Sequence, residues 1–235
     1  MNDLAFRDRA VYFPDAATLV VADTHVGRDE ASGVEFPLGE RADLRERLEA
    51  LLAHFEPREV VFAGDVLHQF GDVTPDAESG LRELLDCCAA ADATPVLVAG
   101  NHDTLLDEVY DGAVHDCYRL EDAYEGEDVL VAHGHEEPAE TALLYVVGHD
   151  HPAIDIEGRK RPCYLYGSGV YRGGDVLMLP AFNRLAAGAT VNGMWGTDFQ
   201  SPLVSSVNEF RPVVYDPDSQ ETLPFPPLGR LRRML

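Results

Sequence analysis

Residues 95–103 have the sequence PVLVAGNHD, a short apolar run that ends in glycine and a polar cluster. Two earlier segments have the same order, an apolar run followed at once by metal-binding residue types. Short apolar runs bounded by such breaks are typical of buried strands. The sequence therefore predicts three strands that each deliver Asp or Asn at the carboxyl end, over residues 18–22, 59–63 and 95–99.

The segments between these strands have the spacing of amphipathic helices. After an irregular stretch to residue 37, one helix is expected to place Leu44, Leu48, Leu51, Leu52 and Phe55 on a single face. A second is expected over residues 75–91, with proline at an early position and leucines facing inward. This βαβαβ order implies right-handed crossovers and a largely parallel sheet. In such sheets ligands bind beyond the carboxyl ends of the strands.

The second half of the chain has a different pattern. Short strands with little helix between them are expected over residues 128–132, 144–147, 161–167 and 175–179, which suggests a second, mixed or antiparallel sheet. From residue 192 the chain is rich in Pro, Gly and Ser, with a helical turn expected within 202–210 and a late strand over 212–215. At 235 residues and 46% apolar content, we expect one domain over residues 1–235, with a Pro/Gly-rich C-terminal portion from about 190.

The formal charge is −24, with 42 acidic residues against 18 basic ones, and Lys160 is the only lysine. Such a surface repels polyanions at low salt and promotes self-repulsion of the folded chain. A cationic partner would require a clustered acidic face, but the acids are spread from Asp3 to Glu221. We therefore favour adaptation to concentrated salt, in which screening acts over about 3 Å at 1 M.

The sequence gives no sign of export or of membrane insertion. The first residues lack a basic region followed by an apolar run, and the longest apolar stretches are too short to cross a bilayer. None of the four cysteines forms a Cys-x-x-Cys pair, so free thiols in a reducing compartment are expected. These features predict a cytoplasmic protein with no membrane partner.

Potential metal ligands occur in five fragments, in a fixed order along the chain. In Asp23-Thr24-His25 and in His149-Asp150-His151, an extended backbone would point the first and third side chains to the same side. A mixed set of oxygens and imidazoles suits Mn, Fe, Co or Zn better than Mg or Ca. The candidate ligands are Asp23, His25, Asp65, Asn101, His133, His149 and His151.

These ordered motifs resemble the calcineurin-like metallophosphoesterase superfamily, whose pattern is D-x-H, GD, GNH[DE], H and GHxH. The match runs from Asp23 to His151. Residues 179–183, LPAFN, are similar to a branch that contains archaeal phosphoesterases related to the nuclease SbcD and bacterial DNA ligase-associated phosphoesterases. The resemblance implies a four-layer α/β/β/α sandwich, in which two mixed sheets are flanked by helices.

The resemblance also implies roles for the site residues and a cofactor. Two divalent ions are expected, with Mn as first choice and Fe, Co or Zn as alternatives. One ion would be held by Asp23, His25, Asp65 and His151, and the other by Asp65, Asn101, His133 and His149, with Asp65 bridging. His102 is similar to the superfamily's catalytic histidine and Asp103 to its orienting partner. A water between two such cations is deprotonated near neutral pH and can attack phosphorus.

Other polar residues leave alternatives open. His68 and His135 are close enough in sequence to the ligands to support them or to contact substrate, but plain packing is equally expected. His54 and His115 have no second ligand nearby, and Asp150 is expected to be solvated or to make a structural hydrogen bond. The basic residues Arg230, Arg232 and Arg233 could contact nucleic acid, although ion pairing or terminal disorder is the simpler interpretation.

Together these features predict a di-metal phosphoesterase that hydrolyses phosphodiester bonds. The resemblance to the SbcD-related branch suggests DNA or another nucleic acid as substrate and association with DNA-repair proteins. One alternative is a phosphodiesterase or phosphatase of a small nucleotide, with a cleft closed by residues 27–37. Another is a non-catalytic metal-binding scaffold, which would not require the His102 and Asp103 pair.

Overall fold

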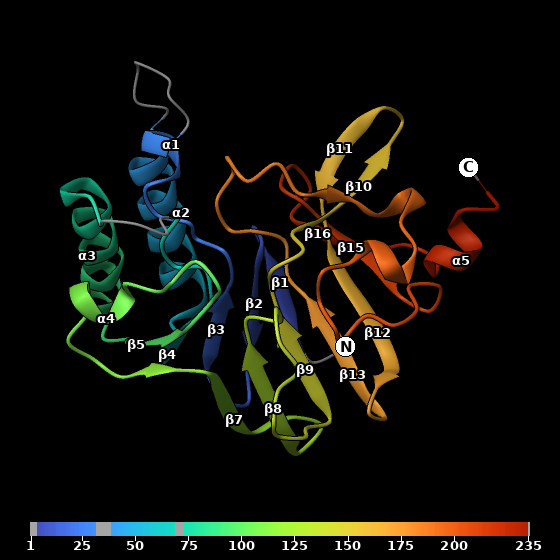
Figure 1. The fold of residues 1–235 in the computed structure, drawn as a ribbon, viewed down its shortest axis with the longest axis horizontal. Coiled ribbons are helices and arrows are strands. Elements are labelled where there is room, and N and C mark those ends of the chain that lie inside the picture. Colours follow the sequence, from blue (N-terminus) through green and yellow to red (C-terminus); the bar gives the residue numbers. More distant parts are fainter. Residues whose placement is uncertain (1–3, 32–38, 69–72, 235) are drawn as a thin grey trace.

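The fold is built on two mixed β-sheets that pack face to face (Figure 1). The computed structural model of the chain describes residues 4–31, 39–68 and 73–234. In order across the first sheet, the strands are β1 (Ala5–Arg7), β2 (Ala10–Phe13), β3 (Thr18–Val21), β4 (Glu59–Ala63), β5 (Thr94–Val98) and β6 (Val114–His115).

Strands β3, β4 and β5 are parallel neighbours. The connections contain α2 (Glu40–Phe55) and α3 (Pro75–Ala90), so the predicted βαβαβ unit is confirmed. Thr74 caps α3 through a hydrogen bond to its side chain from the Ala77 N–H, and Pro75 occupies the first turn as expected. The β1–β2 hairpin, antiparallel to β3, was not predicted because its strands are too short to show a period.

The second sheet is also mixed. In order across it, the strands are β16 (Glu221–Pro224), β15 (Arg211–Asp216), β12 (Tyr164–Tyr171), β13 (Gly174–Met178), β9 (Leu144–Val147), β8 (Glu127–Ala132) and β7 (Cys117–Tyr124). The parallel pairs β8–β9 and β9–β13 lie at its centre, and the outer pairs are antiparallel. The predicted strands at 128–132, 144–147, 175–179 and 212–215 are confirmed in this sheet.

The predicted strand over residues 161–167 is confirmed in part: all of its residues except Cys163 lie in strands, but the chain changes sheet at Cys163. Before it, β11 (Arg159–Pro162) pairs with β10 (Pro152–Ile156), which also pairs with β14 (Ala189–Thr190) in a small third sheet. After it, β12 enters the large sheet. Strand β11 is charged and solvent-facing, whereas β12 begins with buried residues, and this difference in burial separates the two strands.

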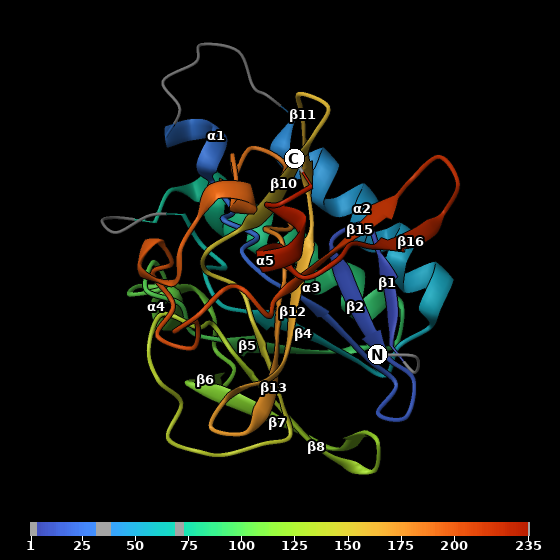
Figure 2. The ribbon, with the colours of Figure 1, turned by 90° about the vertical axis from the view of Figure 1, so that its right-hand side faces the viewer.

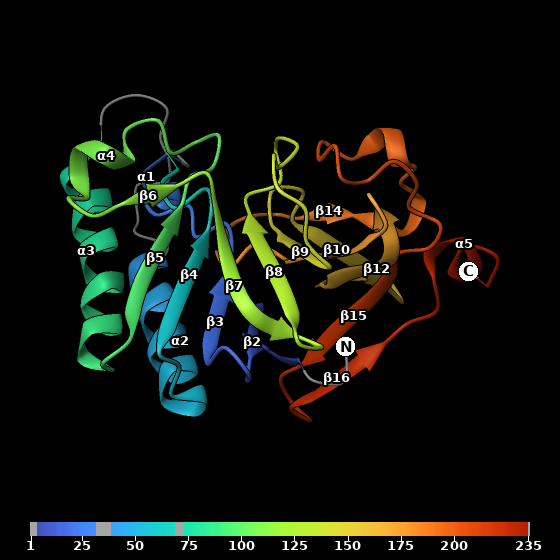
Figure 3. The same cartoon turned by 90° about the horizontal axis from the view of Figure 1, so that it is seen from below.

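Apolar side chains form three clusters, which define the layers. One lies between the two large sheets, and a second lies between the first sheet and helices α2 and α3. The third covers the outer face of the second sheet. Figure 3 shows α2 and α3 along one side of the molecule and the C-terminal segment with α5 (Leu228–Leu231) along the opposite side.

The resemblance implied that helices also cover the outer face of the second sheet, and this expectation is wrong. That outer face packs against β10, the 3-10 helix η1 (Val191–Gly193), α5 and apolar side chains of the loops on either side of the 3-10 helix η2 (Gly196–Asp198), which buries no residue of its own. The helical turn expected within residues 202–210 is also wrong, since that part forms separate hydrogen-bonded turns. Residues 202–210 contain a single proline and no glycine, and buried Phe199 and Phe210 close the core around them.

Two short helices lie near the ends of the parallel strands, namely α1 (Arg28–Ala31) and α4 (Leu106–Val109). Figures 1 and 2 place α1 and the β10–β11 hairpin at the same end of the molecule. None of the described helices has both the length and the apolar character needed to cross a bilayer.

Candidate metal centre

The predicted ligands come from loops that leave the carboxyl ends of neighbouring strands. Asp23 and His25 follow β3, Asp65 follows β4, and Asn101 follows β5. From the second sheet, His133 follows β8, and the pair at residues 149 and 151 follows β9. The two sheets thus deliver all seven predicted ligands to one end, as the strand pattern predicts.

The backbone at five of the seven predicted ligands is left-handed and not extended. The φ angles are 55° at Asp23, 42° at His25, 47° at Asp65, 71° at His149 and 46° at His151. Non-glycine residues rarely adopt this region, and such conformations cluster at functional sites. The expectation that extended backbone aligns each pair of ligands is therefore wrong. Tight left-handed turns bring the side chains together instead.

The ligand atoms of Asp23, His25 and His151 all lie within 4.8 Å of one another, and we call these residues the Asp23 group. His25 Nε2 is 3.3 Å from His151 Nε2, which in turn is 3.2 Å from Asp23 Oδ1. These separations leave the donor atoms facing a common point, as a cation requires.

Asp65, His133 and His149 form a second cluster with the same 4.8 Å limit, here called the Asp65 group. His133 Nε2 lies 3.1 Å from His149 Nδ1 and 3.1 Å from Asn101 Oδ1. Asn101 therefore adds a neutral oxygen to this cluster, as the sequence predicts.

The carboxylate of Asp65 lies between the two groups. Its Oδ1 is 3.4 Å from His133 Nε2, while its Oδ2 is 3.8 Å from His25 Nε2. One oxygen thus faces each cluster of imidazoles, which is the placement required of a ligand shared by two ions.

Glycine is required where the backbone passes close to these carboxylates. A Cβ on Gly100 would lie 2.2 Å from Asp65 Oδ1, and one on Gly148 would lie 2.4 Å from Asp23 Oδ2. Any larger residue would push the carboxylate out of position. The glycines of the GNHD and GHDH motifs therefore hold the shape of the site.

The charges of the buried groups indicate a site built for cations. Burial by itself raises the pKa of Asp65, but His133 and His25 outweigh burial and hold this pKa below its usual value. Burial by itself lowers the pKa of His133, whereas Asp65 and Asp23 raise it to about 9. Without an ion, the proton of His133 balances the carboxylates, and a metal ion would displace it.

Two other imidazoles of the site, those of His25 and His149, are held neutral, whereas at His151 burial is outweighed by Asp23, which raises the pKa. Burial is the main cause that lowers the pKa of His25 to about 3, and burial with the charge of His133 lowers the pKa of His149 to about 4. A neutral imidazole has a free lone pair for a metal. The donor set, its charge and its neutral histidines together fit two divalent ions.

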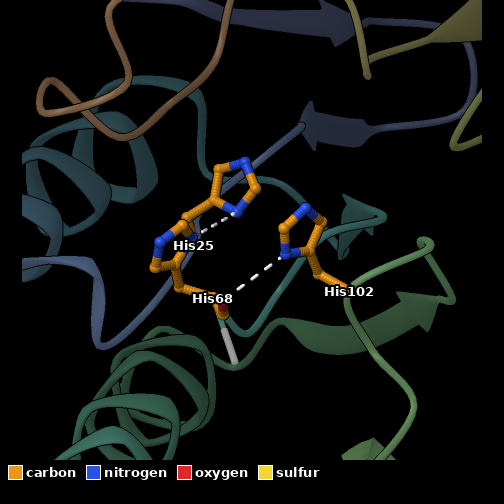
Figure 4. Close-up of side chains that lie close together, drawn as sticks. All are labelled: His25, His68 and His102. Atoms are coloured by element: carbon orange, nitrogen blue, oxygen red, sulfur yellow. Dashed lines mark hydrogen bonds between the residues drawn. The ribbon is translucent and has the colours of Figure 1, made fainter. Parts of the chain in front are cut away.

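His102, His25 and His68 converge at the edge of the site (Figure 4). The backbone N–H of His102 donates to Asp65 Oδ1 at 2.9 Å, and His102 Nε2 is 3.8 Å from Asp65 Oδ2. The His102 and His68 rings are stacked, with centroids 5.6 Å apart and an interplanar angle of 12°. His102 Nδ1 lies 3.4 Å from the His68 carbonyl oxygen. His68 thus contacts both a ligand and the predicted catalytic histidine.

Asp103 is placed to shape the loops. Its carboxylate accepts backbone N–H bonds from Val66 at 3.1 Å, Leu67 at 2.8 Å and Gly100 at 2.8 Å. These bonds join the loop after β4 to the loop after β5. Asp103 therefore positions the backbone that carries Asp65 and His102.

His135 lies beside the Asp65 group. Its ring centroid is 5.2 Å from that of His133, and its buried Nδ1 has no hydrogen-bond partner among the described residues. His135 lines a pocket of about 490 Å³, which we call the acidic pocket because Asp116, Glu136, Glu137 and Glu140 share its wall.

Sequence reasoning missed the residues that support the Asp23 group. Asn183 donates through Nδ2 to the carbonyl oxygens of Thr24 at 2.9 Å and His25 at 3.2 Å, and its N–H donates to the Asp23 carbonyl at 3.2 Å. It also donates to buried Glu40, the first residue of α2. The LPAFN resemblance at residues 179–183 marked the position of Asn183 but gave it no role.

Other predictions are met in part. The Asp150 carboxylate accepts N–H bonds from Gln200 at 2.8 Å and Ser201 at 3.0 Å, so the expected structural hydrogen bond is confirmed. In the C-terminal basic segment, Arg232 donates to the Asn192 carbonyl at 3.0 Å and lies over the Trp195 ring at 5.2 Å. This arginine anchors α5. Among the described residues it makes no ion pair, and its contact with nucleic acid stays a prediction.

Comparison with solved structures shows what the fold is similar to. Nuclease MPE from Pseudomonas putida is 23% identical, with a TM-score of 0.60 over 93% of this chain and 92% of that one. The phosphoesterase Yfce from E. coli is 15% identical, with a TM-score of 0.46 over 88% and 96% of the two chains. A dimetal phosphatase from Danio rerio is 11% identical, with a TM-score of 0.43 over 89% and 98%.

Among curated proteins, no match to the chain is found. The family model described as calcineurin-like phosphoesterase matches residues 17–184, a span that includes every predicted ligand. The fold, the two His/Asp groups and this match agree. The chain therefore belongs to the calcineurin-like phosphoesterase family, whose members are metal-dependent hydrolases of phosphoester bonds.

Proposed function

We propose that this chain hydrolyses phosphodiester bonds of nucleic acid, with DNA as the leading substrate class and His102 as the general acid. The observation that carries the proposal is the position of Asp65. Its carboxylate faces both imidazole clusters, and one of its oxygens is 3.8 Å from His102 Nε2. A predicted proton donor therefore lies against the point where two ions would meet.

In this proposal the metal ligands divide as the two groups do. Asp23, His25 and His151 would hold one ion, His133, His149 and Asn101 would hold the other, and Asp65 would contact both. Bound divalent ions supply positive charge to the phosphoryl oxygens and activate a water for attack. The mixed set of oxygens and imidazoles suits manganese, iron, cobalt or zinc better than magnesium or calcium, and manganese is the first choice because of the family resemblance.

The residues of the chain orient the reaction and move the proton. The hydrogen bond from the His102 N–H to Asp65, together with stacking on His68, fixes the His102 ring. Its Nε2 can then give a proton to the leaving oxygen. Asp103 holds the two loops that carry these residues.

The nucleic-acid part of the proposal rests on the LPAFN segment and on the name of a structural neighbour, a nuclease. Association with DNA-repair proteins follows from the same branch resemblance. The small-nucleotide alternative requires closure by residues 27–37, of which 32–37 lie outside the described residues. The scaffold alternative gives no reason for His102 to lie against Asp65.

A substrate panel tests the proposal. With Mn²⁺ at high salt, we expect hydrolysis of DNA oligonucleotides and of bis-p-nitrophenyl phosphate to exceed that of phosphate monoesters in kcat/KM. RNA and cyclic dinucleotides belong in the same panel. A preference for monoesters, or for cyclic dinucleotides over all strands, would support the small-nucleotide alternative. No turnover of any ester would support the scaffold.

We also propose that the net charge of −24 adapts the protein to concentrated salt. Transfer to low salt should lower the midpoint of thermal unfolding, because unscreened carboxylates repel one another. For a chain of this size, each 1 kcal/mol of repulsion lowers the midpoint by about 2–4 °C. Circular dichroism melts over a series of KCl concentrations measure this effect. A midpoint independent of salt would contradict the adaptation.

A further inference from the structure

A second pocket adjoins the metal centre and has the opposite charge to the rest of the chain. It encloses about 200 Å³ and is lined by His151 of the Asp23 group together with Arg9, Lys160 and Arg184. Among the described residues, no acidic side chain lines it. We call it the basic pocket. In a chain with only 18 basic residues against 42 acids, three cations around one cavity require an explanation.

These cations are held in place by the loops around them. Arg9 Nη1 donates to the carbonyl oxygens of Ala181 at 2.9 Å and Asn183 at 3.0 Å. Lys160, on β11, donates to the Gly188 carbonyl. The partners of Arg9 and Lys160 are thus neutral carbonyls, which orient each cation and leave its charge in place.

Arg184 is partly balanced, since it is 2.8 Å from Asp43 Oδ1 and 3.6 Å from Asp8 Oδ1. Asp8 and Asp43 also act on Arg9 and favour its protonated form, but they do not outweigh burial. Burial, with the nearby charge of Arg47, lowers the pKa of Arg9 to about 10. An anion in the pocket would therefore lower the free energy of this half-buried guanidinium.

The two sides of the metal centre differ in charge. The acidic pocket adjoins His133 on the side of the Asp65 group. Glu137 and Glu140 there are paired with Arg172 and Arg119, which leaves Asp116 and Glu136 to repel a phosphate strand. The basic pocket adjoins His151 on the side of the Asp23 group. A substrate with more than one phosphate can therefore extend favourably from the metal centre toward the basic pocket, and not toward the acidic pocket.

We propose that the basic pocket binds a phosphate group that neighbours the scissile phosphodiester in the substrate strand. This inference rests on the proposed function, because it presumes that a phosphodiester is cleaved at the ligand groups. Arg9, Arg184 and Lys160 are the donors, and the strand runs from the metal centre past His151 toward the β10–β11 hairpin. Figures 1 and 2 place this hairpin at the same end of the molecule as α1, which begins three residues after His25.

Binding is tested first without turnover. The full chain, with divalent ions chelated, is titrated into a short fluorescein-labelled single-stranded DNA, and anisotropy is recorded at several salt concentrations. Lys160→Ala should raise the Kd about three- to tenfold and reduce the slope of log K against log salt by about 0.7. Lys160→Arg should restore binding. Arg82→Ala removes the same charge from exposed α3 and should bind as the parent does.

Equal Kd values and equal slopes for Lys160→Ala and Arg82→Ala would overturn the proposal. Lys160 is exposed on a hairpin, so its removal should leave the thermal midpoint near that of the parent. If Lys160→Ala nevertheless unfolds, Lys160→Gln provides the same loss of charge with a longer side chain.

A double-mutant cycle, in which Lys160 of the protein and one phosphate of the substrate are changed singly and together, then locates the bound phosphate. The metal-loaded enzyme is given oligonucleotides in which one phosphate next to the scissile bond is a neutral methylphosphonate, on either side in turn. The parent should lose kcat/KM on one of the two substrates, and Lys160→Ala should lose much less on that same substrate. Loss of equal size in both proteins would overturn the assignment.

Failure of the proposed function has a different signature. If the parent cleaves no phosphodiester, the anisotropy measurements still decide whether the basic pocket binds a phosphate strand. Lys160→Ala could also lower kcat/KM equally for bis-p-nitrophenyl phosphate and for the oligonucleotide. The pocket would then act only through His151, and this result would also overturn the inference.

Discussion

Replacing His102 with alanine should lower kcat by about 10²–10⁴-fold, the usual contribution of a general acid. His102 Nε2 lies 3.8 Å from Asp65 Oδ2, but His102 is not one of the seven predicted metal ligands. Both ions should therefore remain bound while the leaving oxygen loses its proton source. The hydrogen bond from the His102 N–H to Asp65 is a backbone contact and survives the substitution.

The measurement is kcat for a DNA oligonucleotide, whose leaving group is a basic alkoxide, and for bis-p-nitrophenyl phosphate, whose leaving group is acidic, with metal content determined on the same sample. His54→Ala is the matched control, since His54 is exposed on α2 and should leave kcat unchanged. The parental rate of oligonucleotide hydrolysis in His102→Ala would remove this residue from the mechanism. A less basic leaving group needs less protonation, so the defect should also shrink as the leaving group becomes more acidic.

Substituting Asp65 with asparagine should release metal as well as activity. Its two oxygens face the two ligand groups, and the substitution removes a charge and one acceptor oxygen from a side chain that is 4% exposed. Two-metal sites derive several kcal/mol of transition-state stabilisation from the bound ions, so a loss of at least about 10²-fold in kcat/KM is expected.

Elemental analysis after gel filtration should find fewer than two ions per chain in Asp65→Asn. Asp86→Asn, on the exposed face of α3, should retain the parental stoichiometry. Two ions retained in Asp65→Asn would show that this carboxylate is not shared between them. Partial recovery of activity at high Mn²⁺ would instead support weakened but intact coordination.

Much of the site follows from strand ends alone. Short apolar runs predicted β3, β4 and β5, and parallel strands deliver their following residues to one edge, so Asp23, Asp65 and Asn101 were expected to meet. The order of the motifs also predicted the family that the comparisons show. A single domain over residues 1–235 stays a prediction.

Errors arose where a strand or turn is defined by contacts distant in sequence. The run at 161–167 alternates too weakly to show that the chain changes sheet at Cys163. The outer layer of the second sheet has no helical period because its loops are buried through scattered side chains such as Phe199 and Phe210. The anchoring role of Arg232 was missed for the same reason, because it donates to the backbone carbonyl of distant Asn192.

The sequence by itself determined which residues could bind metal, and in what order, because ligand type and strand period are local properties of the chain. Only the tertiary structure decided how they meet. The left-handed turns at the ligands, the hold of Asn183 on the Asp23 loop and the basic pocket beside His151 each join segments far apart in the chain. Such contacts depend on how the two sheets pack, and local sequence patterns do not predict that packing.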